Sequence, residues 1–271
     1  MFGGEYPVSA KDVAFYEENG YVRFDNVLNE DELQALRAAL ASAKSNRDVH
    51  ARDLAGGDGA NGGDDKILQM LNLWERYDAP REYVLNGRIG RMAKALTKSP
   101  TIHLYHDQAL VKEPGPSAPS PWHQDQPYWP SKEAGMLSCW MALDDVTIER
   151  GCMQFIPGSH KWGEFPPISF VGEGKELKEH MSAQQLALWN PVAVEMPAGS
   201  CTFHHGLTFH YTNANTTSHV RRALVAIFIP EGITYGADEK MDNPFADSIT
   251  SRKGEPLRGT RFPEIAAGVA T

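Results

Sequence analysis

The pattern of apolar residues changes at Pro100, and this change limits the folds open to the chain. Before Pro100, apolar residues recur with a helical period, whereas after it short apolar runs alternate with proline and glycine, as in strands. The strand candidates are residues 101–111, 136–143, 152–156, 192–196, 200–204 and 221–229. Helices followed by many short strands predict a mainly β protein, a sandwich or jelly roll supported by N-terminal helices.

Local signals divide the part of the chain before Pro100 further. A helix is predicted after Ser9, a strand at 21–24, and a second helix over 29–45, where a capping sequence precedes leucines at helical spacing. Apolar positions in 66–96 predict one or two more helices. The Gly- and Asp-rich stretch 55–65 predicts a mobile loop, because it has almost no apolar surface to bury.

A length of 271 residues suits one large β domain, and no linker divides the sequence. We therefore predict a single domain, with helical support over about 9–98, a jelly-roll core over about 100–232, and a C-terminal extension at 233–271.

The net charge of −9 gives no basic field for a nucleic acid or an anionic membrane surface. We predict no nucleic-acid and no membrane partner, and the oligomeric state is not readable. Cys139, Cys152 and Cys201 form no paired motif, which fits core positions and a reducing compartment. With no pattern typical of a signal peptide, this predicts a cytoplasmic location.

Residues 121–130 read PWHQDQPYWP and place a histidine and an aspartate two positions apart. With ten histidines and 35 acidic residues, roughly one such triplet is expected by chance, so the pair is weak evidence alone. On a strand, residues i and i+2 point to the same face, which would let His123 and Asp125 reach one ion.

A third ligand has to come from another strand. The segment FHHGLTFHYTNANTTSH contains four candidates, which are His204, His205, His210 and His219. Among them, His210 ends an apolar stretch just before a polar turn. Two histidines and one carboxylate form the facial triad of non-haem Fe(II) oxygenases, which leaves three positions for cosubstrate and dioxygen.

Three segments occur in the order KEPGPSAPSPWHQDQPYW, CWMALDDVTIERGCMQFIPGSHKWG and FHHGLTFHYTNANTTSHVRRA. This order resembles the phytanoyl-CoA dioxygenase family of Fe(II)- and 2-oxoglutarate-dependent oxygenases, over roughly residues 10–230. The resemblance implies a double-stranded β-helix, which is a cupin-like jelly roll, with His123, Asp125 and His210 as iron ligands. Its implied cofactors are Fe(II), 2-oxoglutarate as cosubstrate, and dioxygen. His204 and His205 are then expected in the core or beside the ligands.

The resemblance also implies a cosubstrate site. Arg221, eleven positions after His210, matches the arginine that binds the distal carboxylate of 2-oxoglutarate, and a guanidinium suits that task because it binds carboxylates bidentately. Arg222 is expected on the opposite face of the strand. Thr212 matches a residue whose hydroxyl contacts the same carboxylate. Further matches near the cosubstrate are Trp140, Gln108, where the family often has methionine, and Lys66.

The implied reaction is hydroxylation of a small organic molecule with release of succinate and CO2. Related halogenases replace the carboxylate ligand with a small residue, and Asp125 leaves no such vacancy. Desaturation, ring formation and epimerisation use the same ligands and stay open. Two other classes also stay open: a zinc-dependent hydrolase, which has no need for Arg221, and a non-catalytic binding protein of the same fold.

Aromatic residues near the histidine motif predict an apolar substrate pocket. The candidates for its wall are Tyr128, Trp129, Trp162 and Phe165. The stretches 55–65 and 163–190 are candidates for a lid over the metal.

Overall fold

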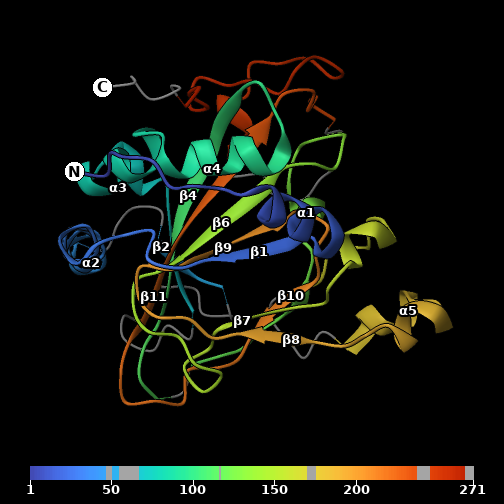
Figure 1. Ribbon diagram of the computed structural model, residues 1–271, viewed down its shortest axis with the longest axis horizontal. Helices are drawn as coiled ribbons and strands as arrows, with labels where there is room; N and C mark the ends of the chain where they lie inside the picture. Colours follow the sequence, from blue (N-terminus) through green and yellow to red (C-terminus); the bar gives the residue numbers. More distant parts are fainter. Residues whose placement is uncertain (47–50, 55–66, 116, 170–174, 237–244, 266–271) are drawn as a thin grey trace.

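Two antiparallel sheets pack face to face in the computed structural model, which describes residues 1–46, 51–54, 67–115, 117–169, 175–236 and 245–265 (Figure 1). The large sheet has the order β1 (Tyr21–Phe24), β9 (Cys201–His205), β6 (Leu137–Ala142), β11 (Arg221–Pro230), β4 (Ile102–Lys112), β3 (Leu68–Leu71) and β2 (Ala51–Asp53). The small sheet has the order β5 (Ser120–His123), β10 (His210–Thr212), β7 (Met153–Phe155) and β8 (Val192–Val194). The predicted mainly β architecture is confirmed.

Helices from the first hundred residues cover the outer face of the large sheet, where α3 and α4 contact its central strands (Figure 1). They are α1 (Ala10–Asn19), α2 (Glu30–Ser45), α3 (Asp78–Leu85) and α4 (Arg88–Thr97), and a short α5 (Ala183–Ala187) comes later in the chain. Short 3-10 helices are η1 (Leu73–Glu75), η2 (Gln126–Tyr128), η3 (Ser159–Trp162), η4 (Lys175–His180) and η5 (Ala246–Ser248). Both α1 and α2 begin at capping boxes, where the sequence predicted an N-cap at Ser9 and a capping sequence from residue 29.

Strand β11 lies at the centre of the large sheet, between β4 and β6. Its sequence reads as an almost continuous apolar run because both faces are covered. Alternate side chains point to opposite faces, so Leu224 and Phe228 join the core under the helices, whereas Val225 and Ile227 join the core between the sheets. The strand therefore belongs to two cores, and its first residue, Arg221, points between the sheets.

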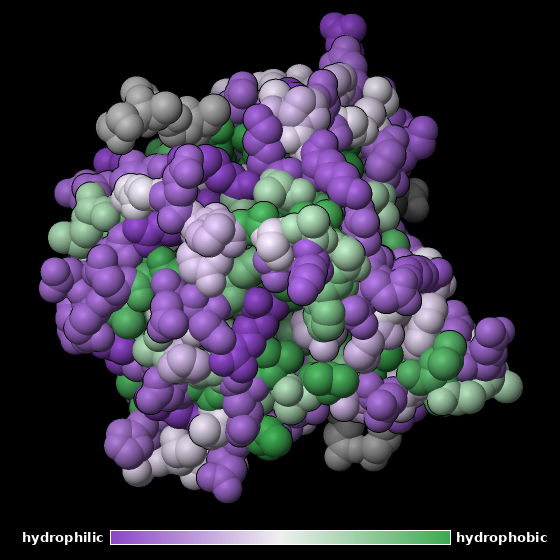
Figure 2. Space-filling model, in the orientation of Figure 1, coloured by the Kyte–Doolittle hydropathy of each residue, from purple (hydrophilic) through white to green (hydrophobic). Residues whose placement is uncertain are grey.

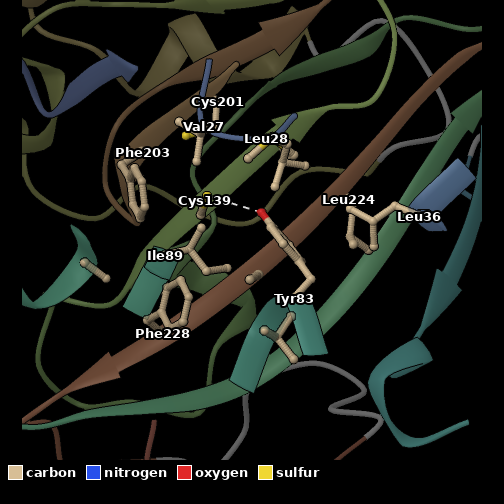
Figure 3. Close-up of a cluster of buried hydrophobic side chains, with 14 of the residues drawn as sticks. Val27, Leu28, Leu36, Tyr83, Ile89, Cys139, Cys201, Phe203, Leu224 and Phe228 are labelled. Atoms are coloured by element: carbon tan, nitrogen blue, oxygen red, sulfur yellow. Dashed lines mark hydrogen bonds between the residues drawn. The ribbon is translucent and has the colours of Figure 1, made fainter. Parts of the chain in front are cut away.

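Figure 3 shows the core between the helices and the large sheet. Tyr83 of α3 reaches the sheet, where its hydroxyl lies 3.7 Å from the sulfur of Cys139 on β6. Ile89 of α4 and Phe203 of β9 pack in the same cluster as Phe228. Cys139, like Cys152 and Cys201, is free and buried, as predicted from its sequence context.

The prediction that a helix begins soon after residue 66 is wrong for residues 68–71, which form strand β3. All four of its residues are buried, with Leu68 and Met70 against the helices and Gln69 and Leu71 toward the small sheet. Because residues on both faces of β3 are buried, the sequence lacks the apolar–polar alternation that marks a strand. The three-residue spacing of Leu68 and Leu71 resembles that of a helix instead. The predicted loop at 55–65 lies outside the described residues.

Hydrophilic side chains cover most of the face seen in Figure 2, with hydrophobic ones gathered near its centre. Within the described ranges, no helix combines the length and the apolar character needed to cross a membrane. That the whole chain forms one domain stays a prediction.

Replacing Phe228 with alanine should destabilise the fold by about 3–5 kcal/mol, because it opens a cavity in the core beneath the helices. Chemical denaturation measures this loss. The matched control is Phe15→Ala, at an aromatic that is 45% exposed, where about 1 kcal/mol or less is expected. Equal losses in both variants would contradict the assignment of Phe228 to the core.

Candidate active site

Three potential metal ligands meet between the two sheets. His123 ends β5 and His210 begins β10, and the two are direct partners in the antiparallel register. Asp125 lies in the turn before η2. One ligand atom from each residue lies within 4.8 Å of the others, and both Nε2 atoms lie 3.6–3.7 Å from Asp125 Oδ1. The structure brings together the three residues predicted as ligands.

The route by which Asp125 reaches this point differs from the expectation. Its backbone, with φ −77° and ψ −34°, is helical rather than extended, so His123 and Asp125 do not share a strand face. The chain turns sharply after β5 instead, and this turn carries the carboxylate to the histidines.

Hydrogen bonds fix the orientation of both imidazole rings. Nδ1 of His123 lies 2.7 Å from the carbonyl oxygen of Pro121, and Nδ1 of His210 lies 3.0 Å from that of Thr208. A carbonyl oxygen only accepts, so Nδ1 donates in each ring and Nε2 keeps its lone pair. Burial lowers the pKa of both histidines, which favours the neutral form that binds metals.

Asp125 is held in a similar way through one of its two oxygens. Oδ2 accepts from Ser138 Oγ at 2.8 Å and from His204 Nε2 at 3.2 Å, which leaves Oδ1 directed toward His123 and His210. Burial raises the pKa of Asp125, but the surrounding histidines outweigh it and hold that pKa well below its usual range. His204 thus lies beside the ligands, as predicted, and Ser138 is a contact that the sequence did not reveal.

Arg221 lies on the inner face of β11 with 1% of its surface exposed. Its Nη1 donates to the carbonyl oxygen of Leu110 at 3.1 Å, and its guanidinium lies 5.5 Å from the ring centre of Trp140. Its Nε has no partner among the described residues, and burial lowers its pKa to about 10. By contrast, Arg222 faces outward and binds Asp144 at 2.6 Å, as expected for the opposite face. A buried guanidinium that forms no ion pair among the described residues fits a carboxylate ligand.

A second buried cation, Lys112, lies beside Arg221, because the two residues are direct partners across β11 and β4. Lys112 is fully buried, and its Nζ donates to Thr212 Oγ1 at 2.7 Å and to the carbonyl oxygen of Asn213 at 2.8 Å. Lys112 was not among the predicted site residues, although it is the first residue of the segment KEPGPSAPSPWHQDQPYW.

A cavity of about 430 Å³ is lined by the triad and by Arg221, and Lys112 is not among the residues that line it. Its wall includes the triad, Arg221, Thr212, Trp140 and Gln108. Aromatic side chains form another part of the wall, namely Tyr105, His106, Tyr128, Trp129 and Phe245. Tyr128 and Trp129 were predicted to form the pocket wall, and both line the cavity. Trp162 and Phe165 were also predicted there, but they pack with Phe209 in a separate cluster. Lys66 lies outside the described residues.

One of the two lid candidates contributes to the cavity wall. Ile168 and Ser169, from the stretch 163–190, line the cavity. Tyr128 anchors this stretch, since its hydroxyl donates to the Ile168 carbonyl at 2.7 Å and accepts from the Ile168 amide at 2.9 Å.

The profile of the family described as phytanoyl-CoA dioxygenase (PhyH) matches residues 16–223, a span that includes the triad and Arg221. The chain belongs to this family. Phytanoyl-CoA dioxygenase, peroxisomal, from Mus musculus is 27% identical over 225 residues, which are 79% of this chain and 66% of the mouse protein. The match therefore spans just under two thirds of that relative's length.

Solved structures similar to this one include the non-haem, α-ketoglutarate-dependent carbocyclase SnoK from nogalamycin biosynthesis, at 29% identity and a TM-score of 0.80. That comparison covers 97% of this chain and all of SnoK. The epimerase SnoN, solved with Fe3+, α-ketoglutarate and nogalamycin RO, is 28% identical with a TM-score of 0.76, over 94% of this chain and 98% of SnoN. The predictions of a jelly-roll fold and of a family using iron, 2-oxoglutarate and dioxygen are confirmed.

Replacing Ser138 with alanine should weaken the affinity for Fe(II) about 10- to 100-fold, because Asp125 loses a hydrogen bond that orients it. Metal titration under anaerobic conditions measures the dissociation constant. Ser200→Ala is the matched control, since Ser200 is also buried but its hydroxyl has no partner in the described part of the chain. An unchanged affinity in Ser138→Ala would show that this bond does not support the metal site.

Proposed function

We propose that this chain is an Fe(II)- and 2-oxoglutarate-dependent dioxygenase that hydroxylates a small organic molecule, with release of succinate and CO2. One observation carries the proposal: His123 Nε2, His210 Nε2 and Asp125 Oδ1 converge, each held by hydrogen bonds made through the other polar atom of its side chain. Three protein ligands leave open positions on an octahedral iron, as the oxygenase reaction requires.

The residues around the triad have distinct parts in this proposal. Arg221 offers its guanidinium to the distal carboxylate of 2-oxoglutarate, with the Trp140 ring against it, and Thr212 offers a hydroxyl. Gln108 faces the cavity from β4 and accepts a hydrogen bond from Gln69. Bound iron, 2-oxoglutarate and dioxygen supply the oxidising chemistry, whereas the protein orients the reactants and excludes water. Lys66 stays a predicted cosubstrate contact.

Arg221 also weighs against the alternatives. A zinc-dependent hydrolase could use the same triad, but it would have no use for a buried guanidinium that lacks an acidic partner among the described residues. A non-catalytic binding protein would not need to retain all three ligands. Similarity to a carbocyclase and an epimerase keeps ring formation and epimerisation as variants of the same chemistry.

The cavity wall favours a small substrate with an apolar or aromatic portion. Its volume lies in the range typical of small-molecule sites, and aromatic side chains approach it from β4, from the turn after β5 and from the C-terminal segment, through Phe245. The net charge of −9 argues against a large polyanionic substrate. We therefore do not propose for this chain the coenzyme A ester that appears in the name of the mouse relative. The same charge argues against nucleic acid as a partner.

A cytoplasmic location is part of the proposal. It is supported by three cysteines that are free and buried, as suits a reducing compartment.

Anaerobic addition of Fe(II) and then 2-oxoglutarate to the apoprotein should produce a weak visible charge-transfer band that requires both. His210→Ala should abolish the band, because one of three ligands is lost. Arg221→Ala should raise the 2-oxoglutarate concentration needed by about 10- to 100-fold, since a charged hydrogen-bond donor is removed, and Arg221→Lys should fall between.

His219→Ala is the control for His210→Ala, because His219 is exposed and lies outside the triad. A wild-type protein that forms no band but binds zinc tightly would point to the hydrolase. A protein that binds neither metal would point to the non-catalytic alternative.

A further inference from the structure

Lys112 is a buried cation that the proposed chemistry does not yet use. It is 0% exposed and lies opposite Arg221, which is 1% exposed, on neighbouring strands of the large sheet. Neither residue forms an ion pair with a carboxylate of the described residues. Asp144, which influences Arg221 electrostatically, is already bound by Arg222. Two like charges are thus buried together, and neither is directly paired with a carboxylate of the described residues.

Such an arrangement is unfavourable in the absence of a ligand. Burying an unpaired charge costs free energy, and a like charge beside it adds repulsion. Consistent with this, burial and the nearby Arg221 lower the pKa of Lys112 well below its ordinary value. An anion arriving at this end of the cavity would stabilise both cations, so the protein is arranged to accept negative charge here.

The hydrogen bonds of Lys112 also fix the hydroxyl of Thr212. An ammonium group only donates, so Thr212 Oγ1 accepts from Lys112 Nζ through one of its lone pairs. The hydroxyl hydrogen of Thr212 must then point away from Lys112, and Thr212 lines the same cavity as Arg221. The second bond, to the Asn213 carbonyl, keeps the ammonium in place. The hydroxyl hydrogen of Thr212 is thereby left to donate, which is the role that a carboxylate ligand requires.

We propose that Lys112 is a positioning residue for the distal carboxylate of the cosubstrate. It acts through the Thr212 hydroxyl and, together with Arg221, makes this end of the cavity selective for a 2-oxo acid with a second carboxylate. The inference rests on the proposed function, because it assumes that the keto acid binds with its far end toward Arg221. Lys112 does not border the cavity, so its influence on the ligand is indirect.

The test compares two 2-oxo acids of five carbons, 2-oxoglutarate and 2-oxopentanoate, of which only the first has a distal carboxylate. Each is titrated anaerobically into the Fe(II)-loaded protein, and the charge-transfer band gives its dissociation constant. Lys112→Met should weaken 2-oxoglutarate about 10- to 100-fold, because a charge and the orientation of a hydroxyl are lost. The affinity for 2-oxopentanoate should stay within about twofold.

Further substitutions at Lys112 and Thr212 separate orientation from charge. Lys112→Gln keeps an N–H donor near Thr212 without the charge, so its loss of 2-oxoglutarate affinity should be smaller than that of Lys112→Met; it also keeps the protein testable if Lys112→Met does not fold. Thr212→Ser keeps the hydroxyl and should bind 2-oxoglutarate nearly as the wild type does. Thr212→Val should weaken 2-oxoglutarate, and adding Lys112→Met to it should cost less than in the wild type.

The exposed Lys161→Met serves as a surface control and should leave both constants unchanged. Equal weakening of both acids in Lys112→Met, or no weakening of 2-oxoglutarate, would overturn the inference and assign Lys112 a structural tie between β4 and β10. Failure of the proposed function looks different, because the wild type itself would then form no iron-dependent band with 2-oxoglutarate.

Discussion

Antiparallel pairing of β5 with β10 is the constraint on which the rest of the site depends. Because His123 and His210 are direct partners, their side chains leave neighbouring strands at the same level, and their ring centres lie 4.1 Å apart. Two backbone carbonyls then fix the rings, and the turn after β5 delivers Asp125 to them. The geometry of the triad is therefore built largely by backbone pairing.

The period of two along β11 separates two arginines that are neighbours in sequence. Arg222 points outward and binds a carboxylate, whereas Arg221 points inward and forms no ion pair with a carboxylate of the described residues. Two adjacent residues of one strand therefore have different roles: Arg222 forms a structural ion pair, and Arg221 is left to bind a ligand. Burial of Arg221 keeps its electrostatic influence strong, because the surrounding medium screens it less than water would.

Much of this arrangement could be predicted from the sequence. Apolar runs bounded by proline and glycine indicated the long strands, capping residues indicated α1 and α2, and the order of three segments led to the triad and to Arg221. Strand β3 could not be identified, since residues buried on both faces lose the alternation that marks a strand. Ser138 and Lys112 were also missed, because their partners, Asp125 and Thr212, lie 13 and 100 positions away and only the folded structure shows these contacts.

The side chains that hold the ligands come from both layers of the sandwich. His123 and His210 belong to the small sheet, whereas Asp125 is anchored to the large sheet through Ser138 on β6 and His204 on β9. An ion held by this triad would therefore cross-link the two layers, and its binding free energy would add to the stability of the fold. At a free metal concentration 100 times the dissociation constant, this addition is about 2.7 kcal/mol. The iron supply would then affect the lifetime of the folded protein as well as its catalytic rate.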